Sequence, residues 1–155
     1  MNMKGFLNLR IIVDADACPG RNIIEKAAIE NYIDVFMYCD INHILKSNYS
    51  KITYVDSGFQ SVDMKIVNEA KKEDIVITQD FGVAAMVLGK GAYAISPKGR
   101  IYSNDNIERL LFERHLGQKI RRGGGRTSNH KKRNIEDDER LYNSLIKIIN
   151  SKKGE

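Results

Sequence analysis

The sequence has little of what marks several protein classes. Its 155 residues include only two cysteines, two prolines and no tryptophan. Cys18 and Cys39 are too few for a disulfide framework and too far apart for a CxxC site. No apolar run approaches the ~20 residues of a membrane span, and the start lacks the apolar segment and cleavage site of a secretory signal. We therefore expect a cytoplasmic protein with no membrane partner.

The net charge of +5 is concentrated toward the C-terminal end. Residues 1–117 carry 14 basic and 15 acidic side chains, whereas residues 118–155 carry 11 and 5. Three consecutive glycines, 123–125, disfavour a helix in residues 118–134. A flexible basic strap fits a polyanion such as RNA, although a solvated linker would have the same composition. The expected nucleic-acid contacts in the strap are Arg121, Arg122, Arg126, Lys131, Lys132 and Arg133.

Apolar runs alternate with helical patterns along the chain. The runs are apolar on both sides, which is typical of strands buried between two helix layers. The sequence predicts an α/β three-layer sandwich with a mostly parallel central sheet of about five strands. The expected strands are 9–13, 33–39, 52–55, 75–78 and 92–95, and the expected helices are 19–30, 61–72, 83–88, one from Ser103 or Asn104, and 135–149. The expected organisation is a core (1–117), the basic strap (118–134) and a C-terminal helix packed on the core (135–155).

Acidic side chains follow the predicted strands. Asp14 and Asp16 follow the first strand and Asp80 follows the fourth. Parallel strands end at one edge of a sheet, where α/β proteins bind ligands. Carboxylates that gather there repel one another unless a cation lies among them, and carboxylates are ligands for Mg²⁺. The sequence thus predicts a metal site at Asp14, Asp16 and Asp80.

Other acids have simpler explanations. Asp40 and Asp56 end the second and third strands, and Asp74 precedes the fourth; aspartate is common at such turns. Asp63 opens a predicted helix, so it either points to the same edge or complements the helix dipole. His43 lies near that edge and could contact nucleic acid, although an ordinary loop histidine is equally compatible.

Several motifs resemble one family. They are IIVDADACP (11–19), VDSGFQSVD (55–63), DIVITQDFGVAAMVLGKGA (74–92), SPKGRIY (96–102) and the glycine-rich tail. Together they resemble the YaiI/YqxD family of uncharacterised bacterial proteins, whose fold is similar to the PIN nuclease domain. The resemblance implies a PIN-like core, Mg²⁺ or Mn²⁺ as cofactor, cleavage of RNA phosphodiester bonds, and pairing of two copies of the chain.

The resemblance also implies roles for individual residues. Asp14, Asp63 and Asp80 would be the metal-binding and catalytic acids, and Asp16 an additional ligand or a group that orients water. Thr78 would hydrogen-bond a ligand or the attacking water. Two positions depart from the family pattern, because Gln60 and Met64 stand where carboxylates are usual. Their loss lowers the local negative charge and could weaken a second metal site; Arg126 also replaces a proline after the glycines.

Two alternatives to a ribonuclease remain open. A non-catalytic RNA-binding module would keep the basic strap without using the acids. A phosphatase of the haloacid-dehalogenase type would use Asp14 as a nucleophile, with Thr78 and Lys90 as later members of its site. The sequence contains no GxGxxG or Walker motif, so no nucleotide cofactor is indicated.

Overall fold

One mixed sheet forms the centre of the protein in the computed structural model, which describes residues 9–56, 58–124 and 132–154. Its strand order is β3-β2-β1-β4-β5-β6. The strands are β1 (Arg10–Asp14), β2 (Asp34–Asp40), β3 (Lys51–Val55), β4 (Ile75–Ile77), β5 (Tyr93–Ile95) and β6 (Ile101–Tyr102). The first five are parallel, and β6 runs antiparallel to β5. The predicted sheet is confirmed; β6 was missed because two residues show no alternation.

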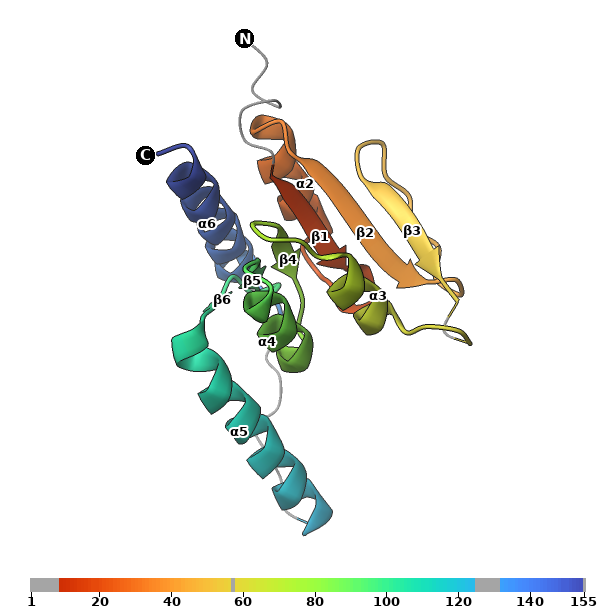
Figure 1. Ribbon diagram of the computed structural model, residues 1–155, viewed down its shortest axis with the longest axis vertical. Helices are drawn as coiled ribbons and strands as arrows, with labels where there is room; N and C mark the ends of the chain where they lie inside the picture. The colour runs from red at the N-terminus through yellow and green to blue at the C-terminus, as the bar shows by residue number, and fades with distance from the viewer. Residues whose placement is uncertain (1–8, 57, 125–131, 155) are drawn as a thin grey trace.

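Helices cover both faces of the sheet (Figure 1). They are the short 3₁₀ helix η1 (Ala15–Ala17), α2 (Arg21–Glu30), α3 (Val62–Glu69), α4 (Phe81–Gly89), α5 (Asn104–Arg122) and α6 (Ile135–Lys152). Two apolar cores lie between the layers: one joins the sheet to α2 and α6, the other to α3, α4 and α5. The three-layer α/β sandwich is therefore confirmed.

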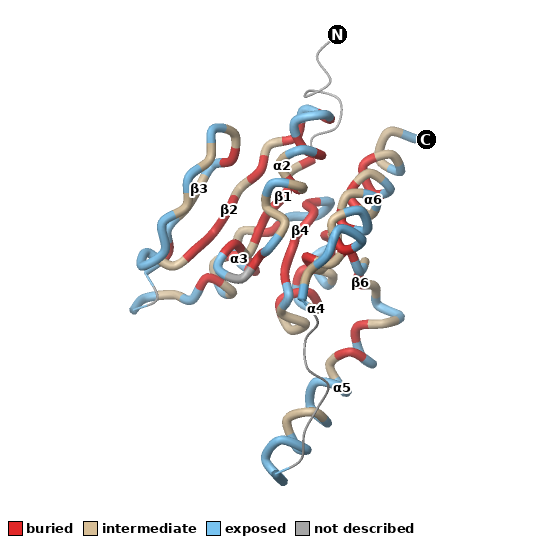
Figure 2. The backbone as a smooth tube through the Cα atoms, turned by 180° about the vertical axis from the view of Figure 1, so that it is seen from behind, coloured by how far each residue is buried: buried red, intermediate tan, exposed pale blue. Residues whose placement is uncertain are grey.

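The alternation of β1 explains why both faces are apolar. Ile11 and Val13 belong to the core under α2 and α6, whereas Ile12 belongs to the opposite core. All three side chains are fully buried, and β1 and β4 form the buried middle of the molecule in Figure 2. Strands with helices on both sides must be apolar at every position, which is the pattern in the sequence.

The strand order reverses between β1 and β4. From β1 the chain proceeds outward to β2 and β3, and it then returns through α3 to β4 on the other side of β1. In open α/β sheets, such a reversal opens a crevice at the carboxyl ends of the two strands. We call the side of the sheet where β1 to β5 end the carboxyl edge.

Helix α5 extends past residue 117, where the core was expected to end. It continues to Arg122 and ends against the first tail glycine, Gly123, so residues 118–122 of the predicted strap are helical. Its second half extends past the carboxyl edge, away from the rest of the molecule (Figures 1 and 2). Phe112, Leu116 and Ile120 are exposed there. No helix within the described ranges is both long and apolar enough to cross a membrane.

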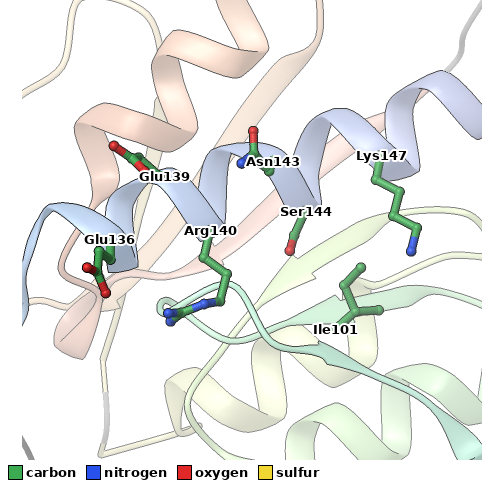
Figure 3. A pocket seen from close by; sticks show the side chains of 7 residues that line it. All are labelled: Ile101, Glu136, Glu139, Arg140, Asn143, Ser144 and Lys147. Carbon is green, nitrogen blue, oxygen red and sulfur yellow. The ribbon is translucent and has the colours of Figure 1, made fainter.

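Helix α6 holds the loop between β5 and β6. Ser144 Oγ donates a hydrogen bond to Gly99 O at 2.5 Å, and Arg140 donates one to Lys98 O at 3.3 Å. Figure 3 shows both side chains pointing from α6 toward this loop, beside a shallow cavity of about 420 Å³. Gly99 has φ +91°, and a Cβ there would lie 2.5 Å from the Arg140 carbonyl carbon. Only glycine permits this close approach.

Gly99→Ala is therefore expected to lower the free energy of unfolding by at least about 2 kcal/mol, because the side chain adds backbone strain and a clash. Gly89→Ala is the matched control. Gly89 lies in α4 with nothing within 4 Å of the added Cβ. The Gly89→Ala substitution is therefore expected to stabilise the protein by about 0.5–1 kcal/mol. Urea unfolding measures both changes, and equal effects would contradict the close packing of Gly99.

Candidate active site at the carboxyl edge

The pairing of β1 with β4 places Asp14 beside Thr78. Val13 is aligned with Ile77, so the next residues of the two strands are neighbours. Thr78 is fully buried, and its hydroxyl donates a hydrogen bond to Asp14 Oδ2 at 3.3 Å. The same Oγ1 accepts from the backbone N–H of Asp80 at 3.0 Å. Thr78 thus contacts the carboxylate of Asp14 and the backbone of Asp80 through one hydroxyl.

Asp80 is the N-cap of α4. Its Oδ1 accepts hydrogen bonds from the backbone N–H groups of Gly82 at 2.8 Å and Val83 at 3.1 Å. These bonds satisfy donors that the first turn of a helix leaves free. Arg114 of α5 reaches the same oxygen, with 3.7 Å between Nη1 and Oδ1. The carboxylate of Asp80 is therefore fixed by its own helix and flanked by one cation.

Asp63 lies in the first turn of α3, whose N-cap is Ser61. Burial raises its pKa, and the carboxylate of Asp80 raises it further, followed by that of Asp16. Arg114 acts in the opposite direction. Asp63 is therefore close enough to Asp80 and Asp16 for their charges to act on it, and it also lies at the amino end of its helix. The two positions considered for this residue, at the carboxyl edge and near the positive end of the helix dipole, are compatible.

The environment of Asp14 is unfavourable for its charge. Burial, followed by repulsion from Asp63, raises the pKa of Asp14 to about 6, and Asp16 and Asp80 contribute smaller repulsions. The hydrogen bond from Thr78 partly offsets them. We call Asp14, Asp63 and Asp80 the acid cluster. Titratable groups shifted in this way are typical of functional sites.

Asp16 and His43 meet at the border of the acid cluster. Asp16 Oδ1 accepts a hydrogen bond from the backbone N–H of Asp40 at 2.9 Å and lies 2.6 Å from His43 Nδ1. His43 is half exposed, so its ring remains accessible from solvent. Asp16 therefore ties the end of β2 to η1, and Asp40 itself accepts from Asn42 N in a turn.

The donor set of the acid cluster fits a hard divalent cation. Within the described part of the chain, no three His, Cys, Asp or Glu side chains converge closely enough to form a complete metal site. Mg²⁺ does not require one, because it is commonly held by one or two carboxylates together with water and substrate phosphates. Asp14, Asp63 and Asp80 supply such oxygens, and the repulsion among them favours a bound cation.

The residues expected to bind nucleic acid are dispersed. Arg121 and Arg122 are exposed in the last turn of α5, and Lys132 is exposed before α6. Arg126 and Lys131 lie outside the described residues. Arg133 does not project freely into solvent as part of a strap. Its Nη2 lies 2.7 Å from Asp138 Oδ1 and its Nη1 donates to Pro97 O at 2.7 Å, so the side chain links the start of α6 to the β5–β6 loop.

Sequence reasoning missed Arg114. It lies 34 residues beyond Asp80 on a helix whose placement no local pattern indicates, and only the packing of α5 on α4 brings the two together. Cys18 follows η1 directly. It is 4% exposed, and burial raises its pKa to about 12, so its thiol is a poor nucleophile.

Asp14→Asn is expected to raise the free energy of unfolding by about 2 kcal/mol at about pH 7.5, since the amide carries no charge to repel. The pKa of Asp14 is about 6 in the folded protein against an ordinary 3.8, so the folded state holds this proton more tightly. Wild-type stability therefore falls as the pH rises from about 4 to about 6, and the stability advantage of the Asn variant vanishes below about pH 4. Thermal unfolding in EDTA across this range measures it.

Asp56→Asn is the control for this experiment. Asp56 is exposed in a turn after β3 at the same edge, and Asn can make the same turn. A pH-dependent gain as large as that of Asp14→Asn would show that net charge, rather than the acid cluster, is responsible.

Comparisons with known proteins identify the family. The profile of the family described as "Uncharacterized BCR, YaiI/YqxD family" matches residues 12–151. A UPF0178 protein of Clostridium novyi is 71% identical over 94% of this chain and 97% of its own length. UPF0178 proteins of Clostridium tetani and Clostridium perfringens are 69% and 57% identical, each over 94% of this chain and 99% and 98% of their own lengths. No solved structure matches the chain at a significant level. The chain belongs to the YaiI/YqxD family.

Proposed function

We propose that this protein is a ribonuclease that depends on a divalent metal ion and hydrolyses phosphodiester bonds at the acid cluster. The observation that carries the proposal is that Asp14, Asp63 and Asp80 lie close enough at the carboxyl edge to repel one another, with the pKa of Asp14 raised to about 6. Such repulsion costs stability, so its presence supports a functional role.

Asp14 and Asp80 would hold Mg²⁺ or Mn²⁺ together with water and substrate phosphate. Asp63 would orient the water or complete a second ion, with Asp16 as an additional ligand or a group that orients water. A bound divalent ion supplies charge stabilisation at a phosphate oxygen and lowers the pKa of a water ligand. The chain's own residues provide the orientation. Thr78 fixes Asp14 by the hydrogen bond to Oδ2, and the cap of α4 fixes Asp80.

Two further groups suit a phosphodiester substrate. The guanidinium of Arg114 lies at the border of the acid cluster, where it can attract a phosphate and favour the charged form of Asp63. Basic residues in the last turn of α5, Lys119, Arg121 and Arg122, extend past the carboxyl edge. Contacts of this kind hold a strand by its phosphates without reading its sequence.

The position of Lys90 favours a nuclease over a phosphatase of the haloacid-dehalogenase type. Lys90 follows the last turn of α4, and its Nζ donates to Val67 O at 2.7 Å. That carbonyl lies in the last turn of α3, whereas the acid cluster lies at the first turns of α3 and α4. The lysine that the phosphatase would need near Asp14 is thus engaged elsewhere.

The decisive experiment incubates the protein with labelled single-stranded and hairpin RNA in Mn²⁺ or EDTA. We expect cleavage in Mn²⁺ only, and a cleavage rate at least about 100-fold lower in the Asp14→Asn/Asp80→Asn variant. Asparagine at position 80 can still cap α4, so the fold is kept. Asp40→Asn/Asp56→Asn removes the same charge from turns at the same edge and is expected to remain active. RNA binding without cleavage would instead favour a non-catalytic binding module.

Arg114→Gln is expected to lower the cleavage rate about tenfold and to move the acidic limb of the pH–rate profile to higher pH. The sign follows from Asp63, because Arg114 lowers the pKa of this carboxyl and its loss delays deprotonation. Arg109→Gln is the control on the same helix, where Arg109 is paired with Glu113 at 3.0 Å. An unshifted profile in Arg114→Gln would contradict the role of Arg114.

A further inference from the structure

A second cavity lies beside the acid cluster. It has a volume of about 700 Å³ and contains none of the predicted catalytic acids in its lining. Gln79 and Phe81, the two sequence neighbours of Asp80, form part of its wall, and Ser96 follows directly after β5. The cavity therefore opens at the carboxyl edge, next to Asp80, and its size is within the range of ligand pockets.

The charge of this cavity is opposite to that of the acid cluster. Its lining includes Lys98, Arg100, Arg133 and Arg140 and no carboxylate. Two carboxylates lie behind the wall, because Asp138 pairs with Arg133 and Asp137 with Arg140. The charged side chains that line the cavity are therefore basic, which favours an anionic ligand. We call this the basic cavity.

Aromatic and proline side chains supply the rest of the lining. Phe81 and Tyr102 pack edge to face with 5.8 Å between ring centroids, and Pro19 and Pro97 contribute further apolar surface. Burial raises the pKa of Tyr102 to about 12, while the Arg100 cation lowers it and the Asp80 carboxylate raises it. Tyr102 thus lies within the influence of both the basic cavity and the acid cluster.

The wall of the basic cavity is held in place. Lys98 and Arg100 belong to the β5–β6 loop. Helix α6 fixes this loop through the hydrogen bond from Ser144 and through the close approach of its backbone to Gly99. Arg133 adds a hydrogen bond to Pro97 O. A site built on fixed elements loses less conformational entropy when a ligand binds.

We propose that the basic cavity binds one nucleotide unit of the RNA strand, adjacent to the phosphodiester at the acid cluster. Lys98 and Arg100 contact the phosphate of that unit, and its base lies against Phe81. A flat base with an attached phosphate fits this combination of aromatic surface and cations better than a bare anion does. The inference rests on the proposed function, since RNA is the substrate that brings a nucleotide to this edge.

Isothermal titration in EDTA tests the proposal without cleavage, using uridine 5′-monophosphate, uridine, inorganic phosphate and a uridine tetranucleotide. We expect the monophosphate to bind more tightly than uridine or phosphate, and the tetranucleotide to compete with it. Lys98→Gln/Arg100→Gln is expected to weaken monophosphate binding at least about tenfold. Lys71→Gln/Lys72→Gln, which removes the same charge at the amino end of β4, is expected to leave it unchanged.

Phe81→Leu separates the base from the phosphate. It is expected to weaken the monophosphate at least about fivefold while leaving inorganic phosphate unchanged. Equal binding of phosphate and monophosphate, equal loss in the Lys71/Lys72 control, or no competition by the tetranucleotide would overturn the proposal. Metal-dependent RNA cleavage without monophosphate binding would overturn this inference alone. Monophosphate binding that depends on Lys98 and Arg100, without cleavage, would support the cavity and reject the ribonuclease.

Discussion

The parallel pairing of β1 with β4 is the contact on which the rest of the structure depends. It joins the two buried central strands, and its register sets the residues at both of their ends. At the amino end it aligns Arg10 with Asp74, and at the carboxyl end it aligns Asp14 with Thr78. A shift of the register by one residue would turn every side chain of β1 to the opposite core. The apolar cores on both faces therefore fix the site as well as the fold.

The two ends of this pair treat a buried carboxylate in opposite ways. Asp74 is almost fully buried, and Arg10 donates two hydrogen bonds to it, at 2.6 and 3.0 Å. Its charge is compensated by this ion pair. Asp14 receives one hydrogen bond from a neutral hydroxyl and faces other carboxylates. Asp74 is thus neutralised by Arg10, whereas Asp14 has no such cation among the described residues and lies at the edge where ligands bind in this class of fold.

Much of this arrangement could be predicted from the sequence, because the signals were local. Strands apolar at every position indicated a sheet covered on both faces, and the ends of the first and fourth strands located Asp14 and Asp80. The remaining features depend on tertiary placement. Arg114 reaches the acid cluster only through the packing of α5 on α4, and Arg133 lines the basic cavity only because α6 returns to the β5–β6 loop. The basic strap was expected to begin at residue 118, but the glycines that disfavour a helix begin only at 123, so residues 118–122 still belong to α5.

An enzyme that binds a polyanion beside carboxylates must overcome their repulsion for the substrate. A metal ion reduces that repulsion at the reacting phosphate, but the neighbouring phosphates of a strand require compensation of their own. In this protein, positive charge lies around the acid cluster rather than within it, at Arg114, at the end of α5 and in the basic cavity. In a ribonuclease of the proposed kind, opposite charges that lie side by side at one edge would give an RNA strand a preferred position, because a shift along the edge would bring phosphates against carboxylates. The position of the substrate would then follow from electrostatics and shape, without contacts that read its sequence.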